Sequence, residues 1–444
     1  MKVSIISLGC AKNKMDSELF LGLASQYGLD INSNYSYLEL VDEDDLKDAD
    51  IIVINTCGFI ESAKKESIDT ILDMLDYQKD GKIIVVMGCL VERYLEDLKK
   101  EIPEVDYFIS IRNYNQLFKF FQELTHTNKK YDFYKMNRVI STPSKTSYLR
   151  IGEGCDNRCS YCAIPLIRGS HKSRSVEDIM NEVEYLKMMN INEVTLIAQD
   201  TTRYGSDLEN MSLAKLLKMI AEKGYFKWIR VLYLYPDEIT DELIEVFKKY
   251  DSIVNYFDIP IQHANDRLLK LMNRRGTKKD ITELIQKIRR EIKNPIIRTT
   301  LIVGFPTETD EEFKELVEYV DEIKFEHLGV FTYSDEEDTK GYDMYPKVEQ
   351  SIMDKRLDII MKHQKNINDK RLNKLIGKTV TAILDHIDME LNCYAFRYYG
   401  QALDDADGYI YVDFFDAEIG EFYDIEITGF NDYDLIGKHI EKNE

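Results

Sequence analysis

Short apolar runs alternate with longer amphipathic segments over the first 125 residues of the chain. Four runs are rich in β-branched residues and have the length of buried strands, at 2–7, 51–55, 82–87 and 107–110. Two of the intervening segments, 15–27 and 61–77, have the length and spacing of helices. Regular alternation of this kind is typical of a doubly wound parallel sheet. We therefore predict a flavodoxin-like α/β domain over residues 1–125.

A polar segment at 126–147, which contains Pro143, is predicted to be a linker. The region 141–372 then repeats the strand and helix alternation at greater length. Its predicted strands are 148–151, 193–197, 228–234, 256–259, 296–303 and 328–333. This pattern predicts a full or partial (β/α) barrel, closed by a helix at 350–375 that ends before Gly377.

From residue 373 to 444 the pattern changes to short strands separated by acidic turns. We expect strands at 379–384, 394–399, 409–414 and 422–427. Strands this short and this evenly spaced predict a small all-β barrel.

Composition places the protein among ordinary soluble globular chains, since 44% of its 444 residues are hydrophobic and 31% are charged. The longest nearly uncharged apolar stretch, 83–91, is far too short to span a bilayer. Seven cysteines, an odd number, fall in clusters, which favours ligand or redox chemistry over disulfides. We expect a cytoplasmic protein with no membrane partner.

The charge balance opposes a phosphate-rich partner over most of the surface. There are 58 basic and 80 acidic residues, which gives a net charge of −22. A nucleic-acid partner would therefore require a local basic patch.

The most specific chemical signal is the spacing C-x3-C-x2-C at Cys155, Cys159 and Cys162, just after the first predicted barrel strand. Three thiolates in one tight loop can hold a 4Fe-4S cluster and leave one iron without a protein ligand. A structural zinc site would need a fourth ligand at close spacing, and the nearest candidate is His171, nine residues further on.

Three more cysteines, Cys10, Cys57 and Cys89, each follow the end of a predicted parallel strand. The loops at the carboxyl ends of such strands converge on one crevice, so these residues can meet although 47 and 32 residues separate them. Three buried free cysteines that act as small hydrophobic residues remain an alternative.

These motifs together resemble the methylthiotransferase family of radical S-adenosylmethionine enzymes, and the resemblance extends over essentially the whole chain. It implies a methylthiotransferase N-terminal domain at 1–125, a radical core at 141–372 and a TRAM domain at 373–444. The matching segments are Ser7 to Asn13 with Asp16-Ser17-Glu18, Asn55-Thr56-Cys57, Met87-Gly88-Cys89, Cys155 to Pro165, Arg168-Gly169 and Ser173-Arg174.

Within the family, Leu8 to Asn13 and Ile197 to Thr202 most resemble the branch that methylthiolates an aspartate of ribosomal protein S12. The tRNA-modifying branch usually has Gln-Met-Asn after its first cysteine, where this chain has Ala11-Lys12-Asn13. Two alternatives stay open: a tRNA methylthiotransferase of the same architecture, and a non-catalytic iron-sulfur scaffold or electron carrier.

The resemblance implies two 4Fe-4S clusters, one on Cys155, Cys159 and Cys162 and one on Cys10, Cys57 and Cys89. It further implies that two S-adenosylmethionine molecules are used per turnover, that a 5′-deoxyadenosyl radical removes a hydrogen from the aspartate β-carbon, and that a reductant such as flavodoxin or ferredoxin supplies the electron. The chemistry is that of the clusters and the cofactor, so no catalytic side chain is implied.

Several barrel residues are expected at the cofactor, because they follow strands at the carboxyl rim where barrel sites form. Gln199 and Asp200 resemble the position that holds the amino group of the cofactor, although Asp200 also fits a helix start. Gln262 and His263, with Asp258, could line the same pocket, and a structural role for the histidine is an alternative. Gly304 and Glu308 belong to a turn that matches the family except that Thr307 stands where glycine is usual.

Charge favours a protein substrate over tRNA. Residues 373–444 contain 16 acidic and five basic side chains, a net charge of −11 that is half the total for the whole chain. A domain that grips tRNA should offer basic side chains to its phosphates, whereas an acidic domain complements a basic ribosomal protein. Acids that serve only solubility are the alternative explanation.

Overall fold

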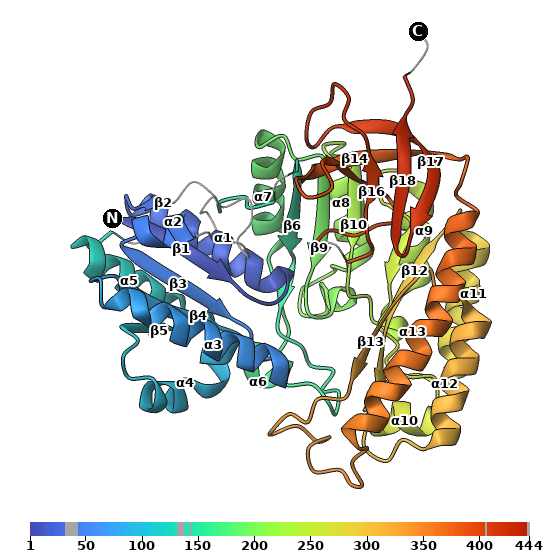
Figure 1. Cartoon of the computed structure of the whole chain (residues 1–444), viewed down its shortest axis with the longest axis horizontal. Coiled ribbons are helices and arrows are strands. Elements are labelled where there is room, and N and C mark those ends of the chain that lie inside the picture. Colours follow the sequence, from blue (N-terminus) through green and yellow to red (C-terminus); the bar gives the residue numbers. More distant parts are fainter. Residues whose placement is uncertain (32–42, 130, 132–137, 143, 405, 442–444) are drawn as a thin grey trace.

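The computed structural model describes residues 1–31, 43–129, 131, 138–142, 144–404 and 406–441. Within these ranges the chain forms three units in sequence order: an α/β sheet, a larger α/β unit and a small β-barrel (Figure 1). Each has its own buried hydrophobic core. Pro143 and most of 130–137, which belong to the predicted linker, lie outside the described residues.

The N-terminal unit is a five-stranded parallel sheet in the order β2-β1-β3-β4-β5, which is the flavodoxin-like order and confirms the prediction. Its strands are β1 (Lys2–Ser7), β2 (Asp30–Ile31), β3 (Ile51–Thr56), β4 (Ile83–Gly88) and β5 (Tyr107–Ile109). Its helices are α1 (Ala11–Gln26), α2 (Glu43–Asp48), α3 (Glu61–Gln78), α4 (Cys89–Glu101) and α5 (Tyr114–Thr125).

Both faces of this sheet are buried, as a doubly wound sheet requires. Along β3, Ile51 and Val53 belong to one hydrophobic core, while Ile52 and Ile54 belong to a second core on the opposite face. Successive side chains of a strand point to opposite faces, so a continuous apolar run is what covering helices on both sides demand.

The second unit is a partial barrel rather than a closed one. Two three-stranded parallel sheets, β10-β9-β6 and β11-β12-β13, meet through a single bridge between Ile229 and Ile253. Strands β6 and β13 border the opening, on the side that faces the N-terminal unit (Figure 1). The strands are β6 (Thr146–Arg150), β9 (Glu193–Ile197), β10 (Trp228–Val231), β11 (Tyr256–Asp258), β12 (Ile296–Val303) and β13 (His327–Thr332).

Helices cover the outside of the partial barrel, and several begin with capping side chains that the sequence could provide locally. Thr277 and Thr309 each form a reciprocal capping box with an acid three residues on. The helices are α7 (Val176–Met188), α8 (Leu213–Glu222), α9 (Asp241–Lys249), α10 (Asp266–Leu271), α11 (Lys278–Glu291), α12 (Asp310–Ile323) and α13 (Gln350–Asn373). Short elements complete the unit: β7 (Gly152–Glu153), α6 (Ile164–Arg168), β8 (Lys172–Ser173), η3 (Thr201–Arg203) and η4 (Pro236–Glu238).

The C-terminal unit is a closed barrel in the order β14-β15-β16-β18-β17. The sequence pattern predicted four strands, and the structure adds a fifth, β18, whose apolar residues Leu435 and Ile436 are too few for a clear strand pattern. The strands are β14 (Thr379–Asp388), β15 (Cys393–Tyr398), β16 (Ile410–Val412), β17 (Phe422–Asn431) and β18 (Asp434–His439).

A buried ion-pair network fastens this barrel to the larger unit. Arg397 of β15 donates to Glu193 of β9 at 3.0 Å and to Asp385 of β14 at 2.9 Å. Arg230 of β10 donates to the other oxygen of Glu193 at 2.9 Å. Because these charges are buried, removing one of them would leave its partner without a counter-charge. The pair of Arg397 with Glu193 is the one that joins the two units.

Among the described residues, no helix is both long enough and apolar enough to cross a membrane.

Candidate functional site

Three adjacent strands of the N-terminal sheet bring Cys10, Cys57 and Cys89 to one edge. Cys10 is the N-cap of α1 after β1, Cys57 directly follows β3, and Cys89 is the first residue of α4 after β4. Since β1, β3 and β4 are parallel neighbours, their carboxyl ends lie side by side. The structure therefore brings together the three cysteines that the sequence separates.

The contacts around Asn13 and Gly9 show how close these cysteines are. The Asn13 Oδ1 atom lies 3.9 Å from Cys10 Sγ and 3.4 Å from Cys89 Sγ. Gly9 has a φ of 94°, and a Cβ added there would lie 3.0 Å from Cys57 Cβ. Glycine is needed at this position both for the backbone angle and for the approach of Cys57.

Burial, with smaller contributions from the neighbouring Cys89 and Cys10, raises the pKa of the Cys57 thiol to about 12. Burial also raises the pKa of Cys89, although Arg168 acts in the opposite direction. Protein groups alone thus disfavour three thiolates at this edge. A bound metal cluster would supply the missing positive charge, because metal coordination deprotonates a thiol outright.

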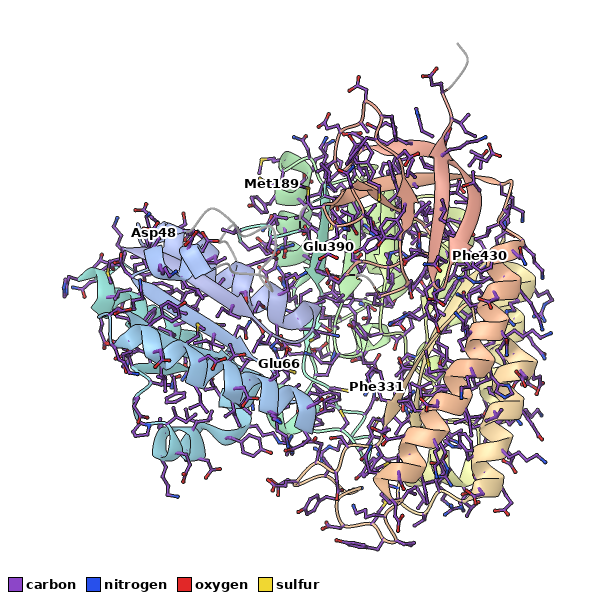
Figure 2. All side chains as sticks on the ribbon, viewed as in Figure 1. Asp48, Glu66, Met189, Phe331, Glu390 and Phe430 are labelled. Atoms are coloured by element: carbon purple, nitrogen blue, oxygen red, sulfur yellow. The ribbon has the colours of Figure 1, made fainter. Side chains whose placement is uncertain are left out.

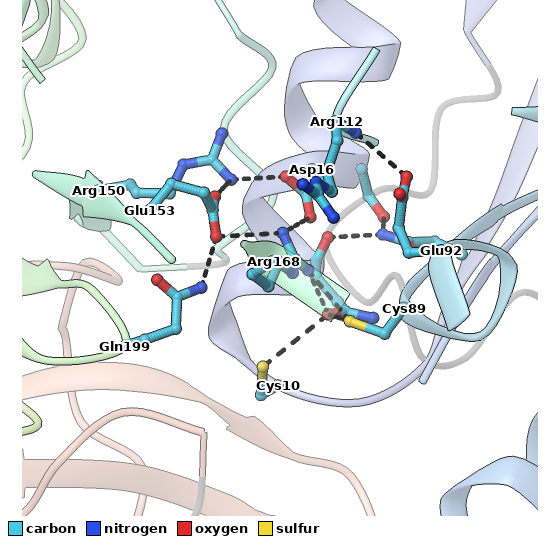
Figure 3. Close-up of polar contacts among 12 residues, drawn as sticks. Cys10, Asp16, Cys89, Glu92, Arg112, Arg150, Glu153, Arg168 and Gln199 are labelled. Carbon is cyan, nitrogen blue, oxygen red and sulfur yellow. Dashed lines mark hydrogen bonds and ion pairs between the residues drawn. The ribbon is translucent and has the colours of Figure 1, made fainter. Parts of the chain in front are cut away.

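Arg168 joins this edge to the barrel (Figure 3). It lies on α6, immediately after the Cys155–Cys162 loop, and its Nη2 donates to Cys89 Sγ at 3.3 Å and to Asn13 Oδ1 at 3.0 Å. Its Nη1 lies 2.7 Å from Asp16 of α1. One buried guanidinium therefore contacts two helices of the N-terminal unit, α1 and α4.

The network continues from Asp16 to the barrel rim (Figure 3). Arg150 at the end of β6 pairs with Asp16 at 2.6 Å and with Glu153 at 2.9 Å, and Gln199 donates its Nε2 to Glu153. This chain of contacts fixes the N-terminal cysteine edge relative to the strand ends of the barrel.

The second cysteine triplet, Cys155, Cys159 and Cys162, lies in the loop between β7 and α6. The loop is held by its own backbone, with Cys162 N donating to Cys159 O at 3.0 Å and Cys155 N to Gly169 O at 3.0 Å. Gly154 begins the loop at a φ of 76°, where a Cβ would lie 2.2 Å from the Ser170 carbonyl oxygen. The sequence motif is thus a tight loop that only this glycine permits.

Burial raises the pKa of Cys155 to about 11 and also raises that of Cys162. Arg274, itself buried, lies with Nη1 3.8 Å from Cys159 Sγ. Within the described ranges, no three His, Cys, Asp or Glu side chains converge on one metal ion. A cubane does not require such convergence, because each thiolate binds a different iron.

Gln199 and Asp200 lie at the end of β9 beside this loop. Asp200 accepts a hydrogen bond from Asn157 of the cysteine loop at 2.6 Å and caps η3 through Thr202 N at 3.1 Å, so it has the helix-start role, and its role at the cofactor stays a prediction. The Gln199 Oε1 atom is buried and has no partner among the described residues. An orphaned acceptor here fits a donor such as the amino group of a bound cofactor.

The loops that follow β11 and β12 contain four buried residues of the predicted cofactor site: Gln262, His263, Gly304 and Glu308. Both ring nitrogens of His263 have partners: Nε2 lies 3.3 Å from Glu308 Oε1, and Nδ1 accepts from Asn265 N at 3.0 Å. Glu308 also accepts from Gly304 N and pairs with Arg356 at 3.1 Å. These residues form one connected cluster, in which His263 is held by its protein neighbours.

Asp258 is the last residue of β11 and pairs with Arg298, the third residue of β12. The Arg298 side chain faces Asp258 at 3.5 Å and Asp407 of the C-terminal barrel at 3.4 Å. Two buried carboxylates therefore neutralise the Arg298 side chain.

A cavity of about 850 Å³ opens where all three units meet. Its wall includes Cys10 from the N-terminal sheet, Tyr148 and Tyr233 from the partial barrel, and Asp388 and Asp404 from the C-terminal barrel. A volume of this size is typical of a ligand pocket, and one of the candidate cluster ligands forms part of its wall.

Three residues of this site were not among the predicted site residues: Asn13, Asp16 and Arg168. Asn13 and Asp16 follow Cys10 at three and six residues, a spacing that places them along one face of the first turns of α1. That spacing could have identified them. The pairing of Arg168 with Cys89 over 79 residues has no local signal.

Comparisons with known proteins identify the family. The Radical SAM superfamily model matches residues 149–320. A curated relative from Clostridioides difficile, named ribosomal protein uS12 methylthiotransferase RimO, is 44% identical over 98% of this chain and 98% of its own length. A protein of the same name from Aquifex aeolicus is 41% identical over 99% and 98%. The chain belongs to the RimO family of radical SAM methylthiotransferases.

The other domain matches are those of a RimO-family chain. The model described as "Uncharacterized protein family UPF0004" matches residues 2–110, and the TRAM domain model matches residues 376–440. The resemblance seen in the sequence motifs is thereby confirmed.

Solved structures support the fold of this RimO-family chain. The radical S-adenosylmethionine methyltransferase TsrM from Kitasatospora setae aligns with a TM-score of 0.53 at 12% identity, covering 74% of each chain. The cobalamin-dependent radical enzyme OxsB aligns with a TM-score of 0.51 at 14% identity, covering 89% of this chain and 64% of its own. At such identities the likeness concerns the fold alone.

Proposed function

We propose that this chain methylthiolates the β-carbon of an aspartate in ribosomal protein S12, using two S-adenosylmethionine molecules per turnover. The main support is its similarity, over almost the full length of both chains, to relatives named for modification of this ribosomal protein. The placement of two separate cysteine triplets at strand ends, joined by Arg168, supports the same reaction.

In this proposal Cys155, Cys159 and Cys162 hold one 4Fe-4S cluster and Cys10, Cys57 and Cys89 hold the other. The donor sets fit, because each triplet offers three thiols close together, one for each of three irons of a cubane. When bound, the clusters and the cofactor would supply a 5′-deoxyadenosyl radical and a methylthio group, with an electron from a reductant such as flavodoxin or ferredoxin.

The side chains of the protein serve to position these groups. The Gln199 Oε1 atom, which has no partner among the described residues, would accept the cofactor amino group, while Glu153 holds the Gln199 amide through its Nε2. A group of buried residues holds the loops after β11 and β12 in place through contacts such as that of His263 with Glu308. The group consists of Gln262, His263, Gly304 and Glu308. We assign the N-terminal unit to residues 1–125, the radical core to 141–372 and the substrate-recognition domain to 373–444.

Mass spectrometry of S12 and of tRNA from cells lacking this protein tests the substrate. We expect S12 to lose its methylthio group and tRNA to keep its modifications, and re-expression of the wild-type chain should restore S12. Loss of a tRNA methylthio group with S12 unchanged would instead identify the tRNA-modifying reaction.

Iron and sulfide analysis after anaerobic reconstitution tests the ligand assignment. The wild-type chain should contain about twice the iron of a variant in which Cys155, Cys159 and Cys162 are replaced by Ala, because each triplet holds one cluster. Replacing Cys10, Cys57 and Cys89 should leave some 5′-deoxyadenosine formation but abolish methylthio transfer. Cys393, which is buried in the C-terminal barrel, is the control, and its replacement by Ala should leave the iron content unchanged.

A further inference from the structure

Lys12 is a buried cation with no carboxylate partner in the described part of the chain. Its residue is only 7% exposed, and its Nζ lies 3.0 Å from the centre of the Tyr233 ring. A cation–π contact of this kind holds an ammonium group in place, but it does not neutralise the charge. A buried ammonium without a counter-ion is costly, so its retention needs a reason.

The neighbouring basic side chains are already neutralised. Lys14, on the same helical turn, pairs with Asp404 at 2.8 Å. Arg150 and Arg168 share two carboxylates: Asp16 lies at 2.6 and 2.7 Å, and Glu153 lies at 2.9 and 3.5 Å. Of these cations around Cys10, Lys12 is therefore the one that still has an uncompensated charge.

The backbone next to Lys12 also favours an anion. Lys12 is the second residue of the 16-residue helix α1, and the first turn of this helix contains no acidic residue. Cys10, its N-cap, forms no capping hydrogen bond through its side chain. The positive end of the helix dipole thus adds to the charge of Lys12 at the same place.

Lys12 lies next to the wall of the 850 Å³ cavity, which includes the preceding residue Ala11 and the ring partner Tyr233. It lies two residues after Cys10, and its partner Tyr233 lies at the barrel rim, where Tyr233 N donates to Asp258 at 2.9 Å and Tyr233 O accepts from Thr201 N at 3.0 Å. Tyr233 and Cys10 both form part of the wall of the 850 Å³ cavity. The ammonium group thus lies between the N-terminal cysteine edge and the barrel rim.

We propose that Lys12 binds the carboxylate of the target aspartate and so determines that the substrate is an acidic side chain. This inference rests on the proposed function. The carboxylate next to the reacting β-carbon carries a negative charge that an ammonium group can bind.

A four-way comparison of enzyme and substrate variants tests the inference. The anaerobically reconstituted full-length enzyme and its Lys12→Met and Lys12→Gln variants are each combined with S12 and with S12 in which the target aspartate is replaced by Asn. Fluorescence anisotropy gives the Kd of each pair, and mass spectrometry gives the rate of methylthiolation. Iron content and circular dichroism show that each variant is assembled.

We expect the wild-type enzyme to bind the Asp form of S12 about tenfold more tightly than the Asn form, as a close charge pair allows. Both neutral variants should bind the two forms equally, with only the Asp form weakened. Lys12→Arg should keep most of the preference. Lys14→Met removes the same charge from the same turn, but because Lys14 is already paired with Asp404 we expect it to keep the wild-type ratio.

An unchanged preference for Asp over Asn in assembled Lys12→Met and Lys12→Gln enzymes would overturn the assignment of Lys12 alone. Failure of the wild-type enzyme to methylthiolate S12 at all would overturn the proposed function first. The two failures are therefore distinguishable.

Discussion

Thr307 has a backbone φ of 71°, which is a left-handed conformation. It stands at a position where the family that this sequence resembles usually has glycine. The turn thus keeps a left-handed backbone with threonine in place of glycine, and this backbone is strained. Two contacts hold the residue: Arg267 donates to its hydroxyl at 3.0 Å and to its carbonyl oxygen at 2.8 Å.

We expect Thr307→Gly to increase the free energy of unfolding by about 0.5–1 kcal/mol, because relief of left-handed strain exceeds the entropy cost of glycine. Urea unfolding measures the change. Thr309→Gly is the matched control, since Thr309 caps α12 with an ordinary φ of −89° and its loss should destabilise the protein. A lower midpoint for Thr307→Gly would show that the contact with Arg267 outweighs the strain.

At the scale of single residues, the sequence predicted which cysteines would group together, because strand ends converge in a parallel sheet. It could not predict that Glu153 holds the Gln199 amide or that Glu308 contacts His263. Those contacts span 46 and 45 residues, a separation for which hydrophobic periodicity has no signal.

At the scale of elements, the junction of β9, β10, β14 and β15 depends on buried charge rather than on apolar packing alone. Arg397 is fully buried and contacts both Glu193 and Asp385. Replacing Arg397 by Met would leave two buried carboxylates with fewer partners.

We expect Arg397→Met to reduce the free energy of unfolding by about 3–5 kcal/mol, the usual result of removing one partner of a buried ion pair. Thermal and urea unfolding measure the loss. Lys438→Met is the control, since Lys438 pairs with Glu426 on the exposed surface of the same barrel and its loss should change stability by less than about 1 kcal/mol. A loss for Arg397→Met as small as for the control would contradict the importance of this network.

Acid should weaken the same junction. Burial alone would raise the pKa of Asp385, but Arg397 and His386 overcome this effect and lower it from 3.8 to about 2. Because the folded pKa is below the unfolded one, the unfolded chain binds the proton first. The stability due to Asp385 is therefore complete above pH 4 and is lost as the pH falls from about 4 to about 2.

Urea unfolding of the apoprotein at several pH values should show this loss, which amounts to about 2 kcal/mol for a shift of this size. The Asp385→Asn variant should show a shallower decline over the same range. Parallel curves for the two proteins would mean that Asp385 makes no contribution to the acid sensitivity.

Element boundaries were predictable to within a few residues wherever an apolar run was continuous. Strands β9 and β12 were predicted in full, whereas β14 and β17 extend four residues beyond the predicted ends. The extra residues of each strand pair with the next strand or the strand that follows a short turn, as Asp388 does with Cys393 of β15 and Asn431 with Asp434 of β18, and their own composition gives no strand signal.

At the scale of the whole molecule, the acidic C-terminal barrel offers a surface to a basic partner. Asp404 and Asp407 are not free for this purpose, because Asp404 pairs with Lys14 and Asp407 is buried. Exposed acids instead include Glu390, Asp413 and Asp416. Glu390 lies on the turn after β14 (Figure 2), two residues beyond the cavity residue Asp388.

We expect replacement of Glu390, Asp413 and Asp416 by their amides to weaken S12 binding by about tenfold at low salt and to flatten its dependence on ionic strength. Anisotropy titrations over a range of salt concentrations measure both. The matched control replaces three exposed acids on the barrel helices, Asp241, Glu283 and Glu318, and should bind like wild type. Equal weakening in the two triple variants would indicate a general charge effect instead of a docking surface.

The number and type of the three units were predictable from the sequence, but their mutual arrangement was not. The contacts that fix the arrangement, such as Arg168 with Asp16 and Lys14 with Asp404, join residues 152 and 390 positions apart. The sequence motifs include Asp16 and Arg168, but nothing in them indicates which residues these side chains contact.

The cavity where the three units meet is completed only late in the synthesis of the chain. Its wall is made of residues from Ser7 near the start of the chain to Tyr411 near its end. All six cysteines proposed as cluster ligands are synthesised long before the last part of that wall. Under the proposed function, a chain cut short before residue 385 keeps both cysteine triplets but lacks part of the cavity wall, so we expect activity only once translation is nearly complete.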